Sequence, residues 1–255
     1  MSRNQREIKV VAVIQARMGS SRLPGKVMRE LGGKPVLAHV IDRVGTCELI
    51  DEVVVATTTA NADDVIAAES RRMGARVFRG PENDVLRRYA DAARQARADV
   101  VVRVTSDCPL VDPTVLSGML DQFLSAAAEG RGPDYLSNTL DRTFPRGLDA
   151  EIFRFAALER ANAEATEPHQ REHVTPYIWE HPQRFAIRQY KGEEDHSDLR
   201  WTLETEADWR FLSAVFGLLG DSGGEPTTAA VLQLLDRHPE LKSINMHVEQ
   251  KQARP

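Results

Sequence analysis

The chain has 255 residues and a formal net charge of −5 at pH 7, with 42% hydrophobic and 28% charged residues. This composition is typical of a globular protein with one substantial core, and the acidic balance argues against a broad nucleic-acid-binding surface, which needs a basic face. No apolar stretch approaches the ~18 residues of a membrane span, and the first ten residues lack the apolar centre of a signal peptide. Cys47 and Cys108 are too few for a disulfide framework. We therefore expect a cytoplasmic protein without membrane or nucleic-acid partners.

The first half of the chain alternates between apolar runs and amphipathic stretches. Three continuous apolar runs predict strands that are buried on both faces of a parallel sheet, and they lie at residues 10–15, 52–57 and 100–105. Helices are expected over residues 35–44, 63–73 and 83–97. Asp112 followed by Pro113 predicts the start of another helix, which runs to about residue 127. This alternation predicts a doubly wound α/β layer.

Beyond residue 130 the sequence changes to shorter apolar segments and turns. Strands are expected near residues 135–137, 150–154, 185–190 and 201–203. Helices are expected near residues 156–165, 172–180, 206–219 and 228–238. We expect a single domain over residues 1–255, in which residues 8–130 carry the main sheet, residues 131–203 form a smaller region that covers the substrate, and residues 204–240 close the fold.

The stretch ARMGSSRLPGK, residues 16–26, follows the first apolar run and carries three cations. In an ATP-binding P-loop, two glycines enclose four residues, and a Lys-Ser or Lys-Thr pair follows. Here five residues separate Gly19 from Gly25, and Lys26 precedes Val27, which has no hydroxyl for a metal. The P-loop is therefore excluded, but backbone N–H groups and charge-assisted bonds from cations still favour phosphate. The alternative is a solvated basic turn.

Polar clusters follow the three predicted strands, at the edge where ligands of open α/β sheets bind. The basic loop follows the first strand, three threonines at residues 57–59 follow the second, and TSDCP at residues 105–109 follows the third. Asp107 is the candidate Mg²⁺ ligand, because hard oxygen ligands hold this ion while cations hold a polyphosphate. The alternative for Asp107 is a helix cap or turn former.

The opening block VIQARMGSSRLPGKVMRELGGKPVL resembles the signature of the cytidylyltransferases that activate acidic sugars, the CMP-Kdo and CMP-sialate synthetases. It is closer still to their relatives named after the spore coat polysaccharide biosynthesis protein F. Later blocks resemble that group in the same order, namely GPENDVLRRY, VVRVTSDCPLVDP, FPRGLDAEIF, REHVTPYIWEHP and LRWTLETEADW. The resemblance implies a nucleotidyltransferase fold of the glycosyltransferase-A type, with a mixed, mostly parallel sheet flanked by helices, and Mg²⁺-dependent transfer from an NTP.

By position, the resemblance assigns the NTP to residues at the predicted strand ends. The nucleotide-binding residues would be Ala16, Arg17, Gly19, Ser20, Arg22, Lys26, Thr57, Thr58, Asn83, Asp84 and Asp107. The catalytic residues among them would be Arg17, Arg22, Lys26 and Asp107, which neutralise charge on the reacting phosphates directly or through the metal.

Asp107 and Glu204 are the two candidate metal ligands. The family's second metal carboxylate lies in a DTxxD block, which reads Glu204-Thr205-Glu206-Ala207-Asp208 here. Because glutamate is one methylene longer, the ion or the backbone must shift to accept it. The alternative for Glu204 is an acidic residue that starts a helix.

The candidate acceptor-binding residues are Arg146, Asp149, Glu151, His173 and Arg200. Arg146 and Arg200 could bind a carboxylate, and Asp149 or Glu151 could accept hydrogen bonds from sugar hydroxyls. The resemblance implies that the segment containing His173 lies over the acceptor pocket. The alternative for residues 145–151 is a charged hairpin without a ligand.

Residues 169–173 spell H-x-x-E-H, the inverted zinc-peptidase motif, which makes zinc hydrolysis a rival function. Pro168 predicts that a helix begins here, so that His169 would lie in its opening turn. Surface or hydrogen-bonded histidines are the alternative.

The sequence therefore predicts a CTP-dependent cytidylyltransferase that activates an acidic sugar or related small acid for polysaccharide biosynthesis, with release of pyrophosphate. Its ligands would be Mg²⁺, the nucleoside triphosphate and a small acidic acceptor. Because related synthetases are commonly dimers, we expect a homodimer, with residues 131–203 as the candidate interface. The alternatives are a glycosyltransferase of the same fold, disfavoured because Ser106-Asp107-Cys108 lacks an Asp-x-Asp motif, and a non-catalytic nucleotide-binding partner protein.

Overall fold

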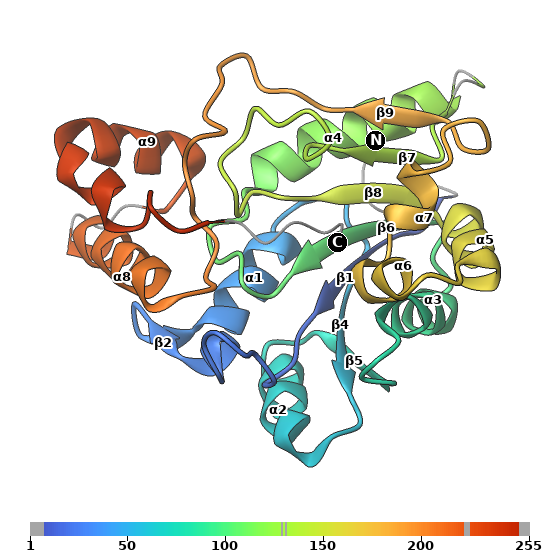
Figure 1. The fold of residues 1–255 in the computed structure, drawn as a ribbon, viewed down its shortest axis with the longest axis horizontal. Coiled ribbons are helices and arrows are strands. Elements are labelled where there is room, and N and C mark those ends of the chain that lie inside the picture. Colours follow the sequence, from blue (N-terminus) through green and yellow to red (C-terminus); the bar gives the residue numbers. More distant parts are fainter. Residues whose placement is uncertain (1–7, 129, 131, 222–224, 250–255) are drawn as a thin grey trace.

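The computed structural model describes residues 8–128, 130, 132–221 and 225–249. They form a seven-stranded sheet with the strand order β5-β4-β1-β6-β8-β7-β9 (Figure 1). The strands are β1 (Val10–Gln15), β4 (Glu52–Thr58), β5 (Arg76–Gly80), β6 (Val100–Thr105), β7 (Tyr135–Ser137), β8 (Glu151–Arg154) and β9 (Ile187–Gln189). Only β8 runs antiparallel to the rest of this sheet. The predicted mixed, mostly parallel sheet is therefore confirmed.

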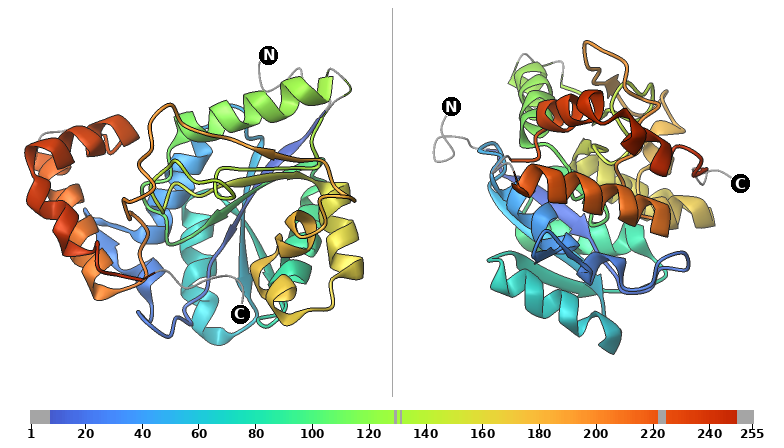
Figure 2. Two further views of the ribbon diagram at one scale, coloured as in Figure 1. Left: turned by 45° about the horizontal axis from the view of Figure 1, so that its top comes forward. Right: turned by 90° about the vertical axis from the view of Figure 1, so that its left-hand side faces the viewer.

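Helices cover both faces of the sheet, as Figure 2 shows. One face packs against α1 (Val36–Gly45), α2 (Asp64–Arg72) and α4 (Pro113–Ala128). The other face packs against α3 (Val85–Ala96), α5 (Phe155–Glu164), α6 (Pro168–His173) and α7 (Pro176–Trp179). Alternate residues of β1 enter the two cores, Ile14 the first and Val13 the second. The strand is apolar throughout because neither face meets water.

A third core joins the end of the chain to loops at the edge of the sheet. Its elements are the hairpin β2 (Glu30–Leu31) and β3 (Lys34–Pro35), α8 (Glu206–Asp221), α9 (Thr228–Arg237) and the 3-10 helix η4 (Pro239–Ile244). Leu23, Leu110 and Trp201 are buried in the same core. The closing helices thus hold loops that follow β1 and β6. None of the helices in the described part of the chain is long and apolar enough to cross a membrane.

Two predicted elements were wrong. The helix expected over residues 172–180 is two short helices, because Val174 has a φ of 75° and ends α6 before Pro176 opens α7. Residues 201–203 form no strand of the sheet, since the Trp201 N–H donates to the Arg146 carbonyl and the Leu203 N–H donates to the Asp107 carbonyl. This segment is therefore held by loops. The prediction also omitted β5 and the β2–β3 hairpin.

Asp208 is a fully buried carboxylate that holds the first turn of α8. Its Oδ1 accepts hydrogen bonds from Arg200 Nε at 2.9 Å and Asn245 Nδ2 at 3.0 Å, and its Oδ2 accepts the Thr205 N–H at 2.9 Å. Burial by itself raises the pKa of Asp208, but the contacts with Arg200 and Asn245 outweigh it, so this pKa lies below its ordinary value. The charged form is therefore the one that the fold stabilises.

We expect Asp208→Asn to lower the free energy of unfolding by about 3 kcal/mol at pH 7, because Arg200 loses a buried counter-charge. Urea denaturation measures this. Since the folded pKa is depressed, the contribution of the carboxylate is present above the unfolded pKa of about 4 and is lost as the pH falls through the folded value, so the difference must shrink in acid. Asp236→Asn is the control, because its side chain is 79% exposed. A cost no larger than that of the control would contradict the prediction.

Candidate active site

The candidate site is a cleft at the carboxyl ends of β1 and β6. After β1 the chain adds β4 and then β5 to one edge of β1, and it later returns to add β6 to the other edge. The loops that follow β1 and β6 therefore diverge. Such a topological switch point is where ligands of open α/β sheets bind. The cleft has a volume of about 1770 Å³ and extends over β8 and the helices α6 and α7.

Thirteen of the candidate residues line this one cleft. They are Ala16, Arg17, Gly19, Ser20, Arg22, Lys26, Asn83, Asp107, Arg146, Asp149, Glu151, His173 and Glu204. Thr57, Thr58, Asp84 and Arg200 are not among the lining residues. The fold thus brings together most of the residues that were assigned to phosphate, metal and acceptor, and their individual roles stay predictions.

The basic loop is closed by hydrogen bonds between its own residues. The Gly25 N–H donates to the Met18 carbonyl at 3.1 Å, and the Leu23 N–H donates to Ser20 Oγ at 3.3 Å. Gly25 has a φ of 69°, a left-handed conformation that favours glycine, and it caps the 3-10 helix η2 (Lys26–Met28). Leu23 is buried in the third core and anchors the loop there, whereas the Arg17 side chain remains 46% exposed.

Lys26 and Asp107 meet at the centre of the switch point. Lys26 Nζ lies 2.6 Å from Asp107 Oδ2 and 2.7 Å from the Leu203 carbonyl, while Thr105 Oγ1 donates to Asp107 Oδ1 at 2.6 Å. Burial by itself raises the pKa of Asp107, but the ammonium of Lys26 and these hydrogen bonds outweigh it and hold the pKa below its usual range. Asp107 is therefore an ionised carboxylate at the floor of the cleft.

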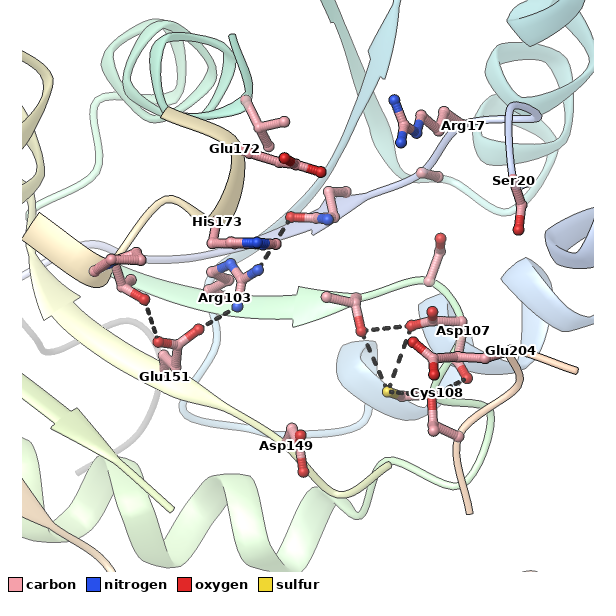
Figure 3. A pocket seen from close by; sticks show the side chains of 18 of the residues that line it. Arg17, Ser20, Arg103, Asp107, Cys108, Asp149, Glu151, Glu172, His173 and Glu204 are labelled. Atoms are coloured by element: carbon pink, nitrogen blue, oxygen red, sulfur yellow. Dashed lines mark hydrogen bonds and ion pairs between the residues drawn. The ribbon is translucent and has the colours of Figure 1, made fainter. Parts of the chain in front are cut away.

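Glu204 lies beside Asp107, as Figure 3 shows, because the neighbouring Leu203 N–H binds the Asp107 carbonyl at 2.8 Å. Glu204 Oε2 lies 2.7 Å from Arg22 Nη2 and 2.7 Å from Arg200 Nη2. The two carboxylates supply the hard oxygen donors that Mg²⁺ prefers, and Mg²⁺ takes its other ligands from water and phosphate. In the described part of the chain, no group of three or more metal-ligating side chains is found. The donors present therefore fit a metal that is shared with a phosphate ligand.

At the other end of the cleft, the two predicted acceptor carboxylates are already paired. Asp149 binds Arg142 through distances of 2.5 and 3.0 Å. Glu151 accepts the hydroxyls of Tyr135 and Thr175 at 2.5 Å each and also contacts Arg103. Among the described residues, by contrast, the Arg146 guanidinium forms no ion pair or hydrogen bond, although the charges of Asp149 and Glu204 act on it. Arg146 is therefore a cation at this end that a ligand can approach.

His173 points into the cleft from the end of α6 (Figure 3). The next residue, Val174, has a φ of 75° and a ψ of −56°, and the Thr175 N–H donates to the His173 carbonyl at 2.9 Å. These values define a γ-turn, which is strained for a β-branched residue. Burial lowers the pKa of His173, so its imidazole is neutral at pH 7.

The candidates outside the cleft hold its walls. Thr57 and Thr58 are buried, and Thr58 Oγ1 donates to Asp63 at 2.5 Å, which in turn accepts the Met18 N–H at 2.8 Å. Asp84 caps α3 through the Arg87 N–H and pairs with Arg171 at 2.6 Å. Arg200 is paired with Asp208 and Glu204.

The H-x-x-E-H motif forms no joint site. His169 Nε2 lies 2.9 Å from Glu180 Oε1, whereas His173 turns toward the cleft. The structure gives the zinc hypothesis no support.

Sequence reasoning missed several cleft residues, among them Gln15, Arg88, Arg103 and Arg142. The signal for Arg103 was present, because a lone arginine interrupts an otherwise apolar strand in VVVRVT. The others lie in ordinary polar contexts, and their positions depend on the packing of distant segments.

Comparison with known proteins agrees with this geometry. The family model described as Cytidylyltransferase matches residues 11–208. The chain belongs to the cytidylyltransferase family. A spore coat polysaccharide biosynthesis protein SpsF of Bacillus subtilis is 32% identical to this cytidylyltransferase over 238 residues, which cover 91% of this chain and 95% of that protein. An uncharacterized protein of Methanocaldococcus jannaschii is 34% identical over 252 residues, which cover 97% of this chain and 98% of that protein.

A cytidylyltransferase structure from Leptospira borgpetersenii superposes with a TM-score of 0.87 at 33% identity, covering 96% of this chain and all of that one. Relatives with shorter matches include 3-deoxy-manno-octulosonate cytidylyltransferases. The resemblance to the acidic-sugar cytidylyltransferases is confirmed, and this cytidylyltransferase is a nucleotidyltransferase enzyme.

We expect Val174→Gly to be more stable than Val174→Ala by about 1 kcal/mol, because glycine relieves the positive φ that alanine retains. Urea denaturation of the two variants measures the difference. The same pair at Val215, a buried residue inside α8, is the control and must show the ordinary order, with alanine more stable by about 1 kcal/mol. If the alanine variant were more stable than the glycine variant at both positions, the result would contradict the proposed backbone strain at Val174.

Proposed function

We propose that this cytidylyltransferase transfers CMP from CTP to an oxygen of a small acidic acceptor, an acidic sugar or a related acid, with release of pyrophosphate. The observation that carries the proposal is the pairing of Lys26 with the ionised Asp107 directly below the basic loop. A phosphate-binding cation and a metal-binding carboxylate are thereby within one site.

The basic loop would bind the triphosphate. Arg17, Arg22 and Lys26 supply positive charge, while Ala16, Gly19 and Ser20 line the cleft in a loop whose backbone N–H groups can approach phosphate. Arg22 and Lys26 are each held by a carboxylate, so their charges are oriented before a ligand binds. Asn83, which lines the cleft beside the start of α3, would contact the nucleobase.

Asp107 and Glu204 would hold Mg²⁺. The ion would neutralise charge on the transferring phosphate and lower the pKa of the acceptor hydroxyl when bound. Asp107 would contact both Lys26 and the metal ion. The Lys26 ammonium can turn from the carboxylate to a phosphate oxygen, because both are anionic partners of similar chemistry.

In the reaction, an acceptor oxygen forms a bond to the α-phosphorus of CTP, and the bond from that phosphorus to the β-phosphate bridging oxygen breaks. The electron pair of the broken bond leaves with pyrophosphate, and the hydroxyl proton passes to solvent. Arg17, Arg22 and Lys26 stabilise the negative charge that develops on the departing group. Arg146 would bind the acceptor carboxylate, and Asp149 and His173 would bind its body, so that the attacking oxygen is oriented.

Pyrophosphate release from CTP, UTP, ATP and GTP tests the proposal, with 3-deoxy-manno-octulosonate and N-acetylneuraminate as acceptors. Nucleotidyl transfer yields pyrophosphate only when an acceptor is present, and we expect it with CTP. A glycosyltransferase would instead release a nucleoside mono- or diphosphate from a nucleotide-sugar. A nucleotide-binding partner protein would do neither, and that result would contradict the proposal.

We expect Lys26→Ala and Asp107→Asn each to lower the rate of pyrophosphate release by about 100-fold or more, because each removes charge stabilisation at the reacting phosphates. Circular dichroism and thermal melting check that the variants fold. Lys34→Ala is the matched control, because Lys34 pairs with Asp42 away from the cleft and is 51% exposed. Full activity in either site variant would count against the mechanism.

A further inference from the structure

Arg103 and Thr105 lie on the same face of β6, because successive side chains of a strand alternate between faces. Both line the cleft, as does Asp107 in the turn that follows the strand. Arg103 pairs in register with Glu151 of β8. Arg103 therefore lies on the acceptor side of the cleft, away from the basic loop.

The guanidinium of Arg103 is held in place from several elements. Its Nη1 contacts Glu151 Oε2, and its Nη2 makes a long hydrogen bond of 3.4 Å to Gln15 Oε1. The Tyr89 ring of α3 lies 5.9 Å below it. This arrangement limits the positions that the side chain can take.

Glu151 is fully engaged by these contacts. One carboxylate oxygen accepts the hydroxyls of Tyr135 and Thr175, and the other contacts Arg103. Glu151 is itself buried, with 6% of its surface exposed. Its contacts with three neighbouring side chains suit a positioning role toward Arg103.

Arg103 keeps hydrogen-bond donors for a ligand. A guanidinium has five N–H groups, and the contacts with Glu151 and Gln15 use only part of them. Nε is buried and has no hydrogen-bond partner among the described residues, so the donors that remain for a ligand are the second N–H groups of Nη1 and Nη2. The side chain is 17% exposed and faces the same space as His173 (Figure 3).

The charges around Arg103 indicate which kind of ligand atom it takes. The carboxylate of Glu151 neutralises the guanidinium, and burial keeps the neighbouring His173 uncharged. Arg146 forms no ion pair among the described residues, although Asp149 and Glu204 lie near enough to act on its charge, and it suits the acceptor carboxylate. A compensated guanidinium with remaining donors suits an uncharged oxygen instead.

We propose that Arg103 binds an uncharged oxygen, a hydroxyl or carbonyl, on the body of the acceptor, and that Glu151 is the residue that positions it. This inference rests on the proposed function, because it assumes an acceptor in the cleft. It makes Arg103 a determinant of acceptor specificity, since an analogue without that oxygen leaves a half-buried donor unpaired.

The test compares acceptor and nucleotide binding in two variants, using whichever of the two acids gives the higher kcat/KM with the wild-type enzyme. Arg103→Lys keeps the charge but loses the forked donors, and we expect the acceptor KM to rise about 10- to 100-fold. The Kd of CTP, measured by calorimetry with Mg²⁺, must stay within about twofold of wild type. The rise in KM must also be similar at about 0.05 and 0.5 M NaCl, because an uncharged oxygen is not screened.

Arg103→Met combined with Glu151→Gln removes both charges, so that no buried ion is left unpaired, and keeps an oxygen for Tyr135 and Thr175. We expect the double variant to fold and to retain the raised acceptor KM. A purely structural ion pair would instead restore the wild-type KM in this variant, and that result overturns the inference. The matched control is Arg94→Met with Glu159→Gln, an ion pair of 3.1 Å between α3 and α5 outside the cleft lining.

The remaining outcomes are also decisive. A weaker Kd for CTP in Arg103→Lys, with an unchanged acceptor KM, would make Arg103 a nucleotide contact and overturn the inference alone. A KM penalty that disappears at high salt would make the bound oxygen anionic and overturn the assignment of its charge. Wild-type protein that binds CTP but releases no pyrophosphate with either acid would overturn the proposed function, and the inference would fall with it.

Discussion

The contact between Lys26 and Asp107 is the interaction on which the organisation of the cleft depends. Lys26 begins η2 after the basic loop, and Asp107 lies in the turn after β6, so their contact of 2.6 Å joins two segments that are 81 residues apart. Each side chain alone would be costly to bury with a charge, whereas together they compensate one another. The same pair places a cation suited to phosphate beside a carboxylate suited to a metal ion, which is the combination that the proposed reaction needs.

Charge compensation organises the rest of the cleft in the same way. Arg22 pairs with Glu204, Arg142 pairs with Asp149, and Arg103 pairs with Glu151. These pairs hold the guanidinium groups in fixed orientations, which is how an enzyme prepares an electrostatic environment before the substrate arrives. Arg146 forms no such pair among the described residues, and this contrast underlies the proposed division between contacts with neutral oxygens and contacts with an acid group.

Strain and burial at the acceptor end serve the same purpose. The γ-turn at Val174 directs His173 toward the cleft and Thr175 toward Glu151. The buried pair of Arg200 and Asp208 fixes the segment before α8, which brings Glu204 beside Asp107. Elements that look peripheral in the ribbon, including the closing helices, therefore determine where the site carboxylates lie (Figure 1).

The sequence by itself determined most strands of the sheet, the basic loop and the family, because these depend on local patterns. β1 and β6 were predicted with their observed bounds, since an apolar run of this length is buried wherever it lies. Only the tertiary structure decided which charged residues pair with one another. The sequence indicated Asp149 and Glu151 as contacts of acceptor hydroxyls but not their protein partners, which are Arg142 for Asp149 and Arg103, Tyr135 and Thr175 for Glu151. Those partners come from separate loops and strands. Their contacts form only when distant segments pack together, so the local sequence pattern cannot indicate them.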